Sequence, residues 1–179
     1  MRHFLSRSNR KILQQFTWSN VLLAFDYDGT LSPIVKSPEL AKMRRNTFRL
    51  LSDLVKLFPS ILISGRSQSD AQKMVQGIGF REIVGNHGLE PWNTTDRLRA
   101  EVRRWQPLLE ELFSGLQGVK IEDKTFSLAV HYRQSREKKK GRDTVAKASQ
   151  MLGKMRLVGG KQVINLLPIG APHKGIALI

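Results

Sequence analysis

The segment LLAFDYDGTLSP, residues 22–33, joins an apolar run to two aspartates that are followed by a Gly-Thr pair. Asp26 and Asp28 lie two positions apart, and residues i and i+2 of an extended chain point to the same face. Two carboxylates on one face repel each other unless a cation lies nearby or one of them keeps a proton. Both conditions are useful to an enzyme, so this segment is the first candidate for a catalytic site. The alternative interpretation is a simple turn, since Asp-Gly is a common turn pair.

Apolar runs of strand length alternate with helical patterns in the first half of the chain. Continuous apolar runs are typical of buried parallel strands, and apolar residues spaced three and four apart predict the helices between them. Strands separated by helices form βαβ units, so we predict an α/β fold with a Rossmann-like parallel sheet. The expected elements are strands at 21–26, 60–64 and 82–88, and helices at 46–58 and 67–79.

The pattern changes near residue 93. Residues 97–116 are predicted to be helical although Pro107 can kink that helix, and VKIEDKTFSLAVHYR, residues 119–133, predicts two strands around a turn. A basic helix near 135–151 and short strands near 154–158 and 162–166 complete this part. We therefore predict a basic helical lead-in at 1–20, a core made of 21–92 and 166–179, and an inserted α+β cap at 93–165.

The composition is that of a globular protein with a large basic excess. Hydrophobic residues make up 40% and charged residues 25% of the chain, and the net charge is +15. Such an excess suits an anionic partner. The basic run REKKKGR, 136–142, is interpreted as a solvated face, and no aromatic residues interleave with it as nucleic-acid stacking platforms would. We therefore expect a small anionic ligand and no specific nucleic acid.

Other features of the sequence bear on the cellular setting. The absence of cysteine excludes disulfides and thiolate metal sites. No stretch approaches the ~18 apolar residues that a membrane-spanning helix needs, and residues 1–16 lack the apolar core of a signal peptide. We expect a cytoplasmic protein that does not associate with a membrane, and the sequence leaves its oligomeric state open.

Two further segments carry candidate chemistry. Ser64 in ILISGR follows an apolar strand and precedes a helix, where its hydroxyl and the backbone N–H groups of Gly65 and Arg66 can hold a phosphate. The alternative is an ordinary helix-capping serine. Lys174 in GAPHKGIAL is expected in the first turn of a helix, where a cation opposes the helix dipole. A need for positive charge beside bound phosphate explains such a lysine, and an exposed surface lysine is the alternative.

The segment DYDGTL resembles the first motif of the haloacid-dehalogenase-like phosphatases. The resemblance implies that Asp26 attacks phosphorus to form an aspartyl-phosphate, and that Asp28 acts as general acid and then as general base. It also implies a Mg²⁺ ion held by the Asp26 carboxylate and the backbone carbonyl of Asp28. Ser64 and Lys174 match the second and third motifs of the same family.

Three more segments narrow the resemblance to the trehalose-6-phosphate phosphatases. They are GNHGLE at 85–90, IEDKTFSLAVHYR at 121–133 and NLLPIGAPHKGIAL at 165–178. The resemblance implies Mg²⁺-dependent hydrolysis of trehalose 6-phosphate to trehalose and phosphate. The implied substrate-binding residues are Gly65, Arg66, Glu122, Lys124, Arg133 and Asn165.

Simpler interpretations stand beside some of these assignments. Glu122 and Lys124 could form a cross-strand surface pair. Arg133 and His131 could be strand residues outside the pocket. We interpret His87 as a turn histidine whose hydrogen bonds are satisfied within the protein.

The sequence departs from the family pattern in two places. Asn165 stands near the position of a glutamate that reaches the sugar, which leaves the identity of the sugar phosphate open. The acidic fourth motif does not occur in the five residues after Lys174. From this we expect that the C-terminal strands of the core are missing, that strand 21–26 is an exposed sheet edge, and that the 179-residue chain alone is inactive. The alternatives are another sugar-phosphate phosphatase of the same capped class and a non-catalytic remnant that binds an anionic ligand or a partner.

Overall fold

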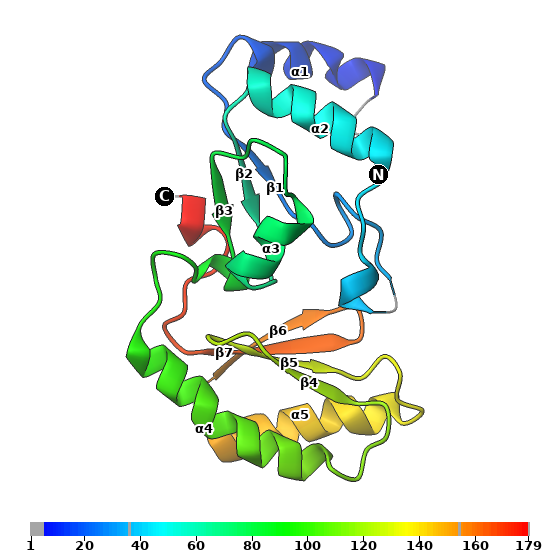
Figure 1. The fold of residues 1–179 in the computed structure, drawn as a ribbon, viewed down its shortest axis with the longest axis vertical. Helices are drawn as coiled ribbons and strands as arrows, with labels where there is room; N and C mark the ends of the chain where they lie inside the picture. The colour runs from blue at the N-terminus through cyan, green and yellow to red at the C-terminus, as the bar shows by residue number, and fades with distance from the viewer. Residues whose placement is uncertain (1–5, 36, 154, 179) are drawn as a thin grey trace.

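The chain forms two sheets that lie one above the other with loops between them (Figure 1). This computed structural model describes residues 6–35, 37–153 and 155–178. The first sheet is parallel, in the order β1-β2-β3, with Ala24 opposite Ile61 and Leu62 opposite Ile83. Its strands are β1 (Leu23–Phe25), β2 (Ser60–Ile63) and β3 (Glu82–Val84). The predicted α/β class with a parallel sheet is confirmed.

Short helices connect and flank the parallel strands. They are η1 (Arg7–Asn9), α1 (Arg10–Thr17), η2 (Pro38–Leu40), α2 (Arg45–Leu57) and α3 (Gln68–Met74). The Ser67 hydroxyl caps α3 by accepting a hydrogen bond from the Asp70 backbone N–H at 3.2 Å. The helix predicted at 67–79 ends earlier, because Val75 leaves helical geometry and Gly77 adopts a φ of 87°. In the described part of the predicted lead-in, residues 6–20, the helical elements are η1 and α1.

Strand β1 differs from the buried strand that its apolar sequence predicts. All four residues of β2 are buried, whereas Leu23 and Phe25 of β1 are only partly buried and Ala24 is exposed. Among the described residues β1 pairs with β2 alone, so it lies at the edge of the described sheet, as the sequence led us to expect. Its apolar character therefore does not correspond to burial.

The second sheet is antiparallel, in the order β4-β5-β7-β6, and helices α4 and α5 cover the face away from the parallel sheet (Figure 1). The elements are α4 (Asp96–Phe113), β4 (Lys120–Asp123), β5 (Leu128–His131), α5 (Lys138–Leu152), β6 (Met155–Gly160) and β7 (Val163–Pro168). The two strands predicted around a turn at 119–133 are β4 and β5. Helix α4 continues past Pro107.

A continuous apolar core lies between this antiparallel sheet and its two helices. Its members are buried side chains from every layer of this region: Val102, Trp105, Leu109, Phe113, Leu128, Val130, Val145 and Leu166. Strand β7 crosses the domain boundary predicted between residues 165 and 166, because it pairs with β5 and β6 on both sides of that position. The unit packed around this core is called the cap below, and the parallel sheet with its helices is called the core domain.

The end of the chain also differs from the prediction. Lys174 precedes a 3-10 turn, η4 (Ile176–Leu178), by two positions and is not in the first turn of a helix. The argument from the helix dipole therefore does not apply to it. None of the helices in the described residues is long and apolar enough to cross a membrane.

Candidate active site

A cleft of about 860 Å³ lies between the core domain and the cap. The ends of the parallel strands open into it, which is where open α/β sheets place their ligands. Residues from both units line the cleft, including nine of the predicted site residues: Asp26, Asp28, Gly65, Arg66, Glu122, Lys124, Arg133, Asn165 and Lys174. The tenth, Ser64, is fully buried directly after β2. The structure thus brings all the predicted residues to one region.

Asp26 follows β1 directly and has a cationic partner from the far end of the chain. The Lys174 Nζ atom lies 2.7 Å from Asp26 Oδ1, and both side chains are partly exposed to the cleft. The ammonium group balances the charge of this carboxylate. The interpretation of Lys174 as an isolated surface lysine is wrong.

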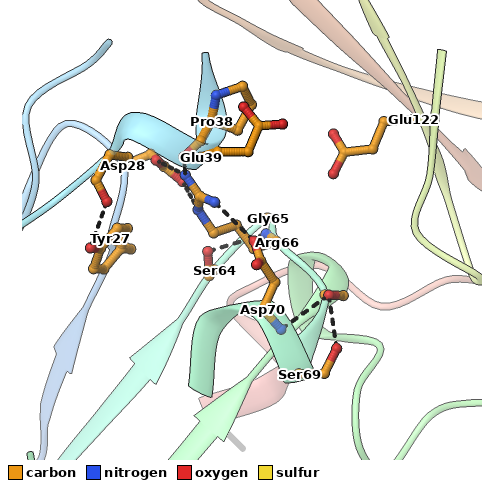
Figure 2. A network of polar contacts seen from close by, with 12 residues as sticks. Tyr27, Asp28, Pro38, Glu39, Ser64, Gly65, Arg66, Ser69, Asp70 and Glu122 are labelled. Carbon is orange, nitrogen blue, oxygen red and sulfur yellow. Dashed lines mark hydrogen bonds and ion pairs between the residues drawn. The ribbon is translucent and has the colours of Figure 1, made fainter. Parts of the chain in front are cut away.

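Asp28 has a different cationic partner. Arg66 donates from Nε to Asp28 Oδ2 at 2.9 Å and from Nη2 to Asp28 Oδ1 at 2.8 Å (Figure 2). The same guanidinium also contacts Asp70 Oδ2 at 2.8 Å and the Pro38 carbonyl at 2.9 Å, and only 7% of the Arg66 side chain is exposed. Burial lowers the pKa of Arg66, but the hydrogen bonds to Asp28 and Asp70 outweigh it and raise that pKa.

These contacts explain how Asp26 and Asp28 can lie close together in spite of their like charges. Each carboxylate has its own cation, so the two negative charges of Asp26 and Asp28 are compensated separately. They also change the interpretation of Arg66. The family resemblance implied that Arg66 binds the substrate. In the structure its guanidinium instead forms hydrogen bonds with two carboxylates and one backbone carbonyl of the protein.

The loop after β2 is closed by an internal hydrogen bond, which occupies one of the two backbone N–H groups that were predicted to hold a phosphate. The Ser64 hydroxyl accepts a hydrogen bond from the Arg66 backbone N–H at 3.1 Å, which closes the loop on itself. The carbonyl of Gly65 accepts a hydrogen bond from Lys124 Nζ of the cap at 3.1 Å. Lys124 also donates to Asn165 Oδ1 at 3.1 Å. This lysine therefore joins the loop of the core domain to strand β7 of the cap.

Burial and neighbouring charges shift the pKa values of two cap residues, Lys124 and Glu122. Burial lowers the pKa of Lys124, and the nearby Glu122 carboxylate opposes this effect. Burial raises the pKa of Glu122, but the hydrogen bond from His131 Nε2 at 2.7 Å and the charge of Lys124 outweigh it, so that pKa is lowered. Glu122 and Lys124 each have a partner of their own, and the interpretation as a cross-strand surface pair is wrong.

Arg133 lines the cleft but binds the protein backbone. Its guanidinium donates to the Val35 carbonyl of the core domain and to the Lys161 carbonyl at 3.0 Å. It therefore bridges the loop before η2 and the turn between β6 and β7. The alternative that placed Arg133 and His131 outside the pocket is wrong, since both line it.

The sequence analysis missed Asn86, which links the two units. This buried side chain donates from Nδ2 to the Lys124 carbonyl at 2.9 Å and to Glu90 Oε2 at 3.0 Å, and it accepts from Ser127 Oγ at 2.6 Å. It lies in the 3-10 turn η3 (Asn86–Gly88), which follows β3. The glycines on either side of Asn86 and His87 were the available signal, because they mark a turn at the end of a strand.

The comparisons with known proteins cover nearly all of this region. The model of the trehalose-phosphatase family matches residues 24–178. The chain belongs to the trehalose-phosphatase family. It is 31% identical over 194 residues to probable trehalose-phosphate phosphatase G of Arabidopsis thaliana, covering 88% of this chain and 50% of that protein. It is 28% identical over 177 residues to trehalose-phosphate phosphatase B of the same plant, covering 88% and 47%. The chain thus spans about half the length of these curated relatives.

A solved structure supports the fold. The C-terminal domain of C. albicans trehalose-6-phosphate phosphatase superposes with a TM-score of 0.79 at 24% identity, covering 94% of this chain and 64% of that one. The sucrose-phosphatase of Synechocystis sp. PCC6803 superposes with a TM-score of 0.53 at 16% identity, covering 89% and 68%. The predicted α/β fold of haloacid-dehalogenase type, with an inserted cap, is therefore confirmed for this chain.

Proposed function

We propose that the protein containing this chain is a phosphatase that hydrolyses trehalose 6-phosphate to trehalose and phosphate through an aspartyl-phosphate. The observation that carries the proposal is the pair Asp26 and Asp28 at the end of β1, with separate cations on each, facing the polar groups of the cap across one cleft. Membership of the trehalose-phosphatase family supports this choice of substrate.

The proposed reaction has two displacements at phosphorus. In the first, a carboxylate oxygen of Asp26 bonds to phosphorus, the bond from phosphorus to the sugar oxygen breaks, and Asp28 gives that oxygen a proton. In the second, water attacks phosphorus, Asp28 takes a proton from the water, and the bond to Asp26 breaks to release phosphate. Lys174 balances negative charge beside Asp26 in both steps.

The Arg66 contact fixes the orientation of the Asp28 carboxylate. Each carboxylate oxygen of Asp28 accepts one hydrogen bond from Arg66. An ionised carboxylate offers about four lone-pair sites, so Asp28 can still exchange a proton with the substrate oxygen while Arg66 holds it. Arg66 in this proposal is a positioning residue for Asp28 and does not bind the phosphate directly.

The donor groups at the cleft fit a Mg²⁺ ion of the kind that keeps several water ligands. Mg²⁺ in phosphate-transferring sites is bound by one or two carboxylates together with the substrate phosphate. The Asp26 carboxylate and the Asp28 backbone carbonyl would hold it here, and the described residues include no group of three or more His, Cys, Asp or Glu side chains that could hold a metal. When bound, the ion would neutralise charge on the phosphoryl oxygens.

The cap would bind the sugar. Glu122, Lys124 and Asn165 line the cleft on the side opposite the aspartates, and their polar groups suit hydroxyls. Asn165 is neutral and already accepts from Lys124 and donates to the Val158 carbonyl at 3.3 Å. The absence of a charge at this position favours, as a second candidate, a different sugar phosphate of the same class.

A substrate panel tests the proposal. Phosphate release would be measured with Mg²⁺ from trehalose 6-phosphate, glucose 6-phosphate and sucrose 6-phosphate, with phosphorylation of Asp26 followed by mass spectrometry. Asp26→Asn is expected to remove both turnover and the phosphorylated peptide, while Asp53→Asn on the surface of α2 leaves both unchanged. Turnover by Asp26→Asn, or preference for another sugar, would contradict the proposal. The same assay on residues 1–179 alone tests the expectation that they are inactive.

The other expectations about partners stay predictions. A small sugar phosphate is the proposed ligand, and weak salt-sensitive binding is expected for nucleic acid. The cytoplasmic location also stays a prediction.

A further inference from the structure

Each backbone carbonyl in the loop that follows β2, residues 64–66, accepts a hydrogen bond from a different donor. The Ser64 and Arg66 carbonyls accept from backbone N–H groups of η3 at 3.0 and 2.6 Å. The Gly65 carbonyl between them accepts from Lys124 Nζ at 3.1 Å. The two outer donors belong to the core domain, whereas the middle donor belongs to the cap. Only the middle peptide of this loop is therefore held by the cap.

These hydrogen bonds also fix where the N–H groups of the loop point. A peptide group is planar, and in its trans form the carbonyl and the N–H point in opposite directions. The bond from Lys124 to the Gly65 carbonyl thus sets the direction of the Arg66 N–H, which donates to Ser64 Oγ at 3.1 Å (Figure 2). The bond from η3 to the Ser64 carbonyl sets the direction of the Gly65 N–H in the same way. Two separate contacts therefore orient the two peptides that meet at Gly65.

Glycine at position 65 makes both contacts necessary. A Cβ atom added to Gly65 would lie 2.6 Å from His87 Cε1, which is closer than atoms can approach, so a side chain here would displace the imidazole ring. His87 itself lies in a turn, as predicted, with a φ of 58°. Glycine has more backbone freedom than any other residue. Holding one of its two peptides therefore does not fix the other.

The cap holds Lys124 at both ends. Its backbone carbonyl accepts from Asn86 Nδ2 at 2.9 Å, and its ammonium group donates to Asn165 Oδ1 at 3.1 Å. An ammonium group has three donor hydrogens. With one on Asn165 and one on the Gly65 carbonyl, a third remains for a hydroxyl of the sugar. Lys124 can therefore contact the sugar and hold the loop at the same time.

We propose that Lys124 is a positioning residue for the loop at 64–66, and that its hydrogen bond to the Gly65 carbonyl holds this loop in the form that binds phosphate. This role is additional to the sugar contact that the family resemblance implies. The inference rests on the proposed function, because it concerns the same cleft. Binding of phosphate then depends on a residue of the cap even when the ligand carries no sugar.

Hydrogen exchange in the ligand-free chain tests the contact itself. Lys124→Met removes the donors and the charge with little change in side-chain length. Lys120→Met is the matched control, because Lys120 lies on the same strand, lines the cleft with its side chain 72% exposed, and pairs with Glu39 at 3.6 Å. We expect the Arg66 amide, followed by NMR, to exchange about tenfold faster in Lys124→Met, the effect of losing one hydrogen bond, and at the wild-type rate in Lys120→Met.

Titration with inorganic phosphate in the presence of Mg²⁺ tests the consequence. The dissociation constant should rise about tenfold in Lys124→Met and less than about twofold in Lys120→Met. Thermal unfolding would verify that both variants are folded. If Lys124→Met does not fold, the same measurements on Lys124→Gln decide the question, because its amide group ends one bond short of the ammonium nitrogen and the same changes are expected.

The remaining outcomes separate the inference from the proposed function. Wild-type exchange of the Arg66 amide in Lys124→Met would overturn the inference and leave the proposed function intact, as would faster exchange with unchanged binding of phosphate. Equal weakening of phosphate binding by Lys124→Met and Lys120→Met would assign the effect to charge alone and also overturn it. The expected changes together with a preference for another sugar phosphate would support the inference and contradict the proposed substrate. Binding of no phosphate by the wild type would overturn both.

Discussion

The core domain and the cap place their polar residues in different ways. In the core domain, Asp26 and Ser64 lie just past the ends of short parallel strands, and loops and ion pairs hold them. In the cap, Glu122, His131 and Asn165 lie within strands of the antiparallel sheet, over a continuous apolar core. If the proposed function is right, the reaction would depend on charges that the core domain balances, whereas sugar binding would depend on side chains held in a packed sheet. Substitutions in the core domain should therefore mainly reduce turnover, and substitutions in the cap should mainly reduce stability.

The largest effect is expected at the acid and base of the core domain. Asp28→Asn removes the group that gives and takes protons and should slow turnover of trehalose 6-phosphate by about 10²–10⁴, the usual contribution of such catalysis. Initial rates with saturating substrate, in the protein containing this chain, give the comparison. Asp70→Asn removes the other carboxylate on Arg66 without touching the proton path and should have a much smaller effect. Equal losses for the two variants would show that Asp28 only holds Arg66 in place.

The packed cap should govern stability. Trp105 is 3% exposed at the centre of the cap core, and Trp105→Ala is expected to lower the free energy of unfolding by about 3–5 kcal/mol. Leu57 at the end of α2 is 74% exposed, and Leu57→Ala should change that free energy by no more than about 0.5 kcal/mol. Urea denaturation of both variants tests the contrast. Similar losses would show that the exposure of Leu57 does not describe its packing in solution.

Substitution of Asn86, which links the core domain to the cap, should have an intermediate effect on stability. Asn86→Ala leaves the Lys124 carbonyl and the Ser127 hydroxyl without their partner, which costs about 1–3 kcal/mol of stability. The same change should raise the KM for the sugar phosphate, because Lys124 is no longer held over the loop. Asn86→Gly tolerates the left-handed backbone and removes the same side chain, so it separates strain from lost hydrogen bonds. Wild-type stability in both variants would show that Asn86 does not join the units.

The sequence predicted most of the fold because its patterns are local. Alternation along 119–133 and apolar runs such as 60–64 correctly indicated the cap hairpin and β2. The set of site residues came from the family resemblance, and the structure gathers them at one cleft. The sequence could not predict which groups each side chain binds. The Arg66 side chain is long enough to reach either a phosphate or Asp28, and only the folded structure shows that it binds Asp28.

Two further features could not be predicted from the sequence: the position of β1 at the sheet edge, and the backbone conformation and packing of His87. An apolar strand has the same sequence whether or not a second strand pairs with it, so the exposure of Ala24 could not be inferred from the residues around it in the sequence. His87 has a left-handed backbone without being glycine, and a histidine in a turn gives no sign that its ring lies against the Gly65 loop. Both properties depend on contacts between residues far apart in the sequence.

The smallest effect is expected at the partly exposed pair Glu122 and His131 of the cap. The pKa of Glu122 in the folded chain lies below its ordinary value of 4.5, so this carboxylate contributes stability at pH values above 4.5 and loses that contribution as the pH falls through the folded-state pKa. Because about a third of its side chain is exposed, solvent screening keeps the contribution under about 1 kcal/mol. Glu122→Gln should therefore destabilise the chain slightly at pH 7 and not at pH 3, as measured by urea denaturation at each pH. Glu111→Gln on the exposed side of α4 serves as the matched control for the substitution. A larger loss for Glu122→Gln at pH 3 than at pH 7 would show that the hydrogen bond to His131 does not stabilise the ionised carboxylate.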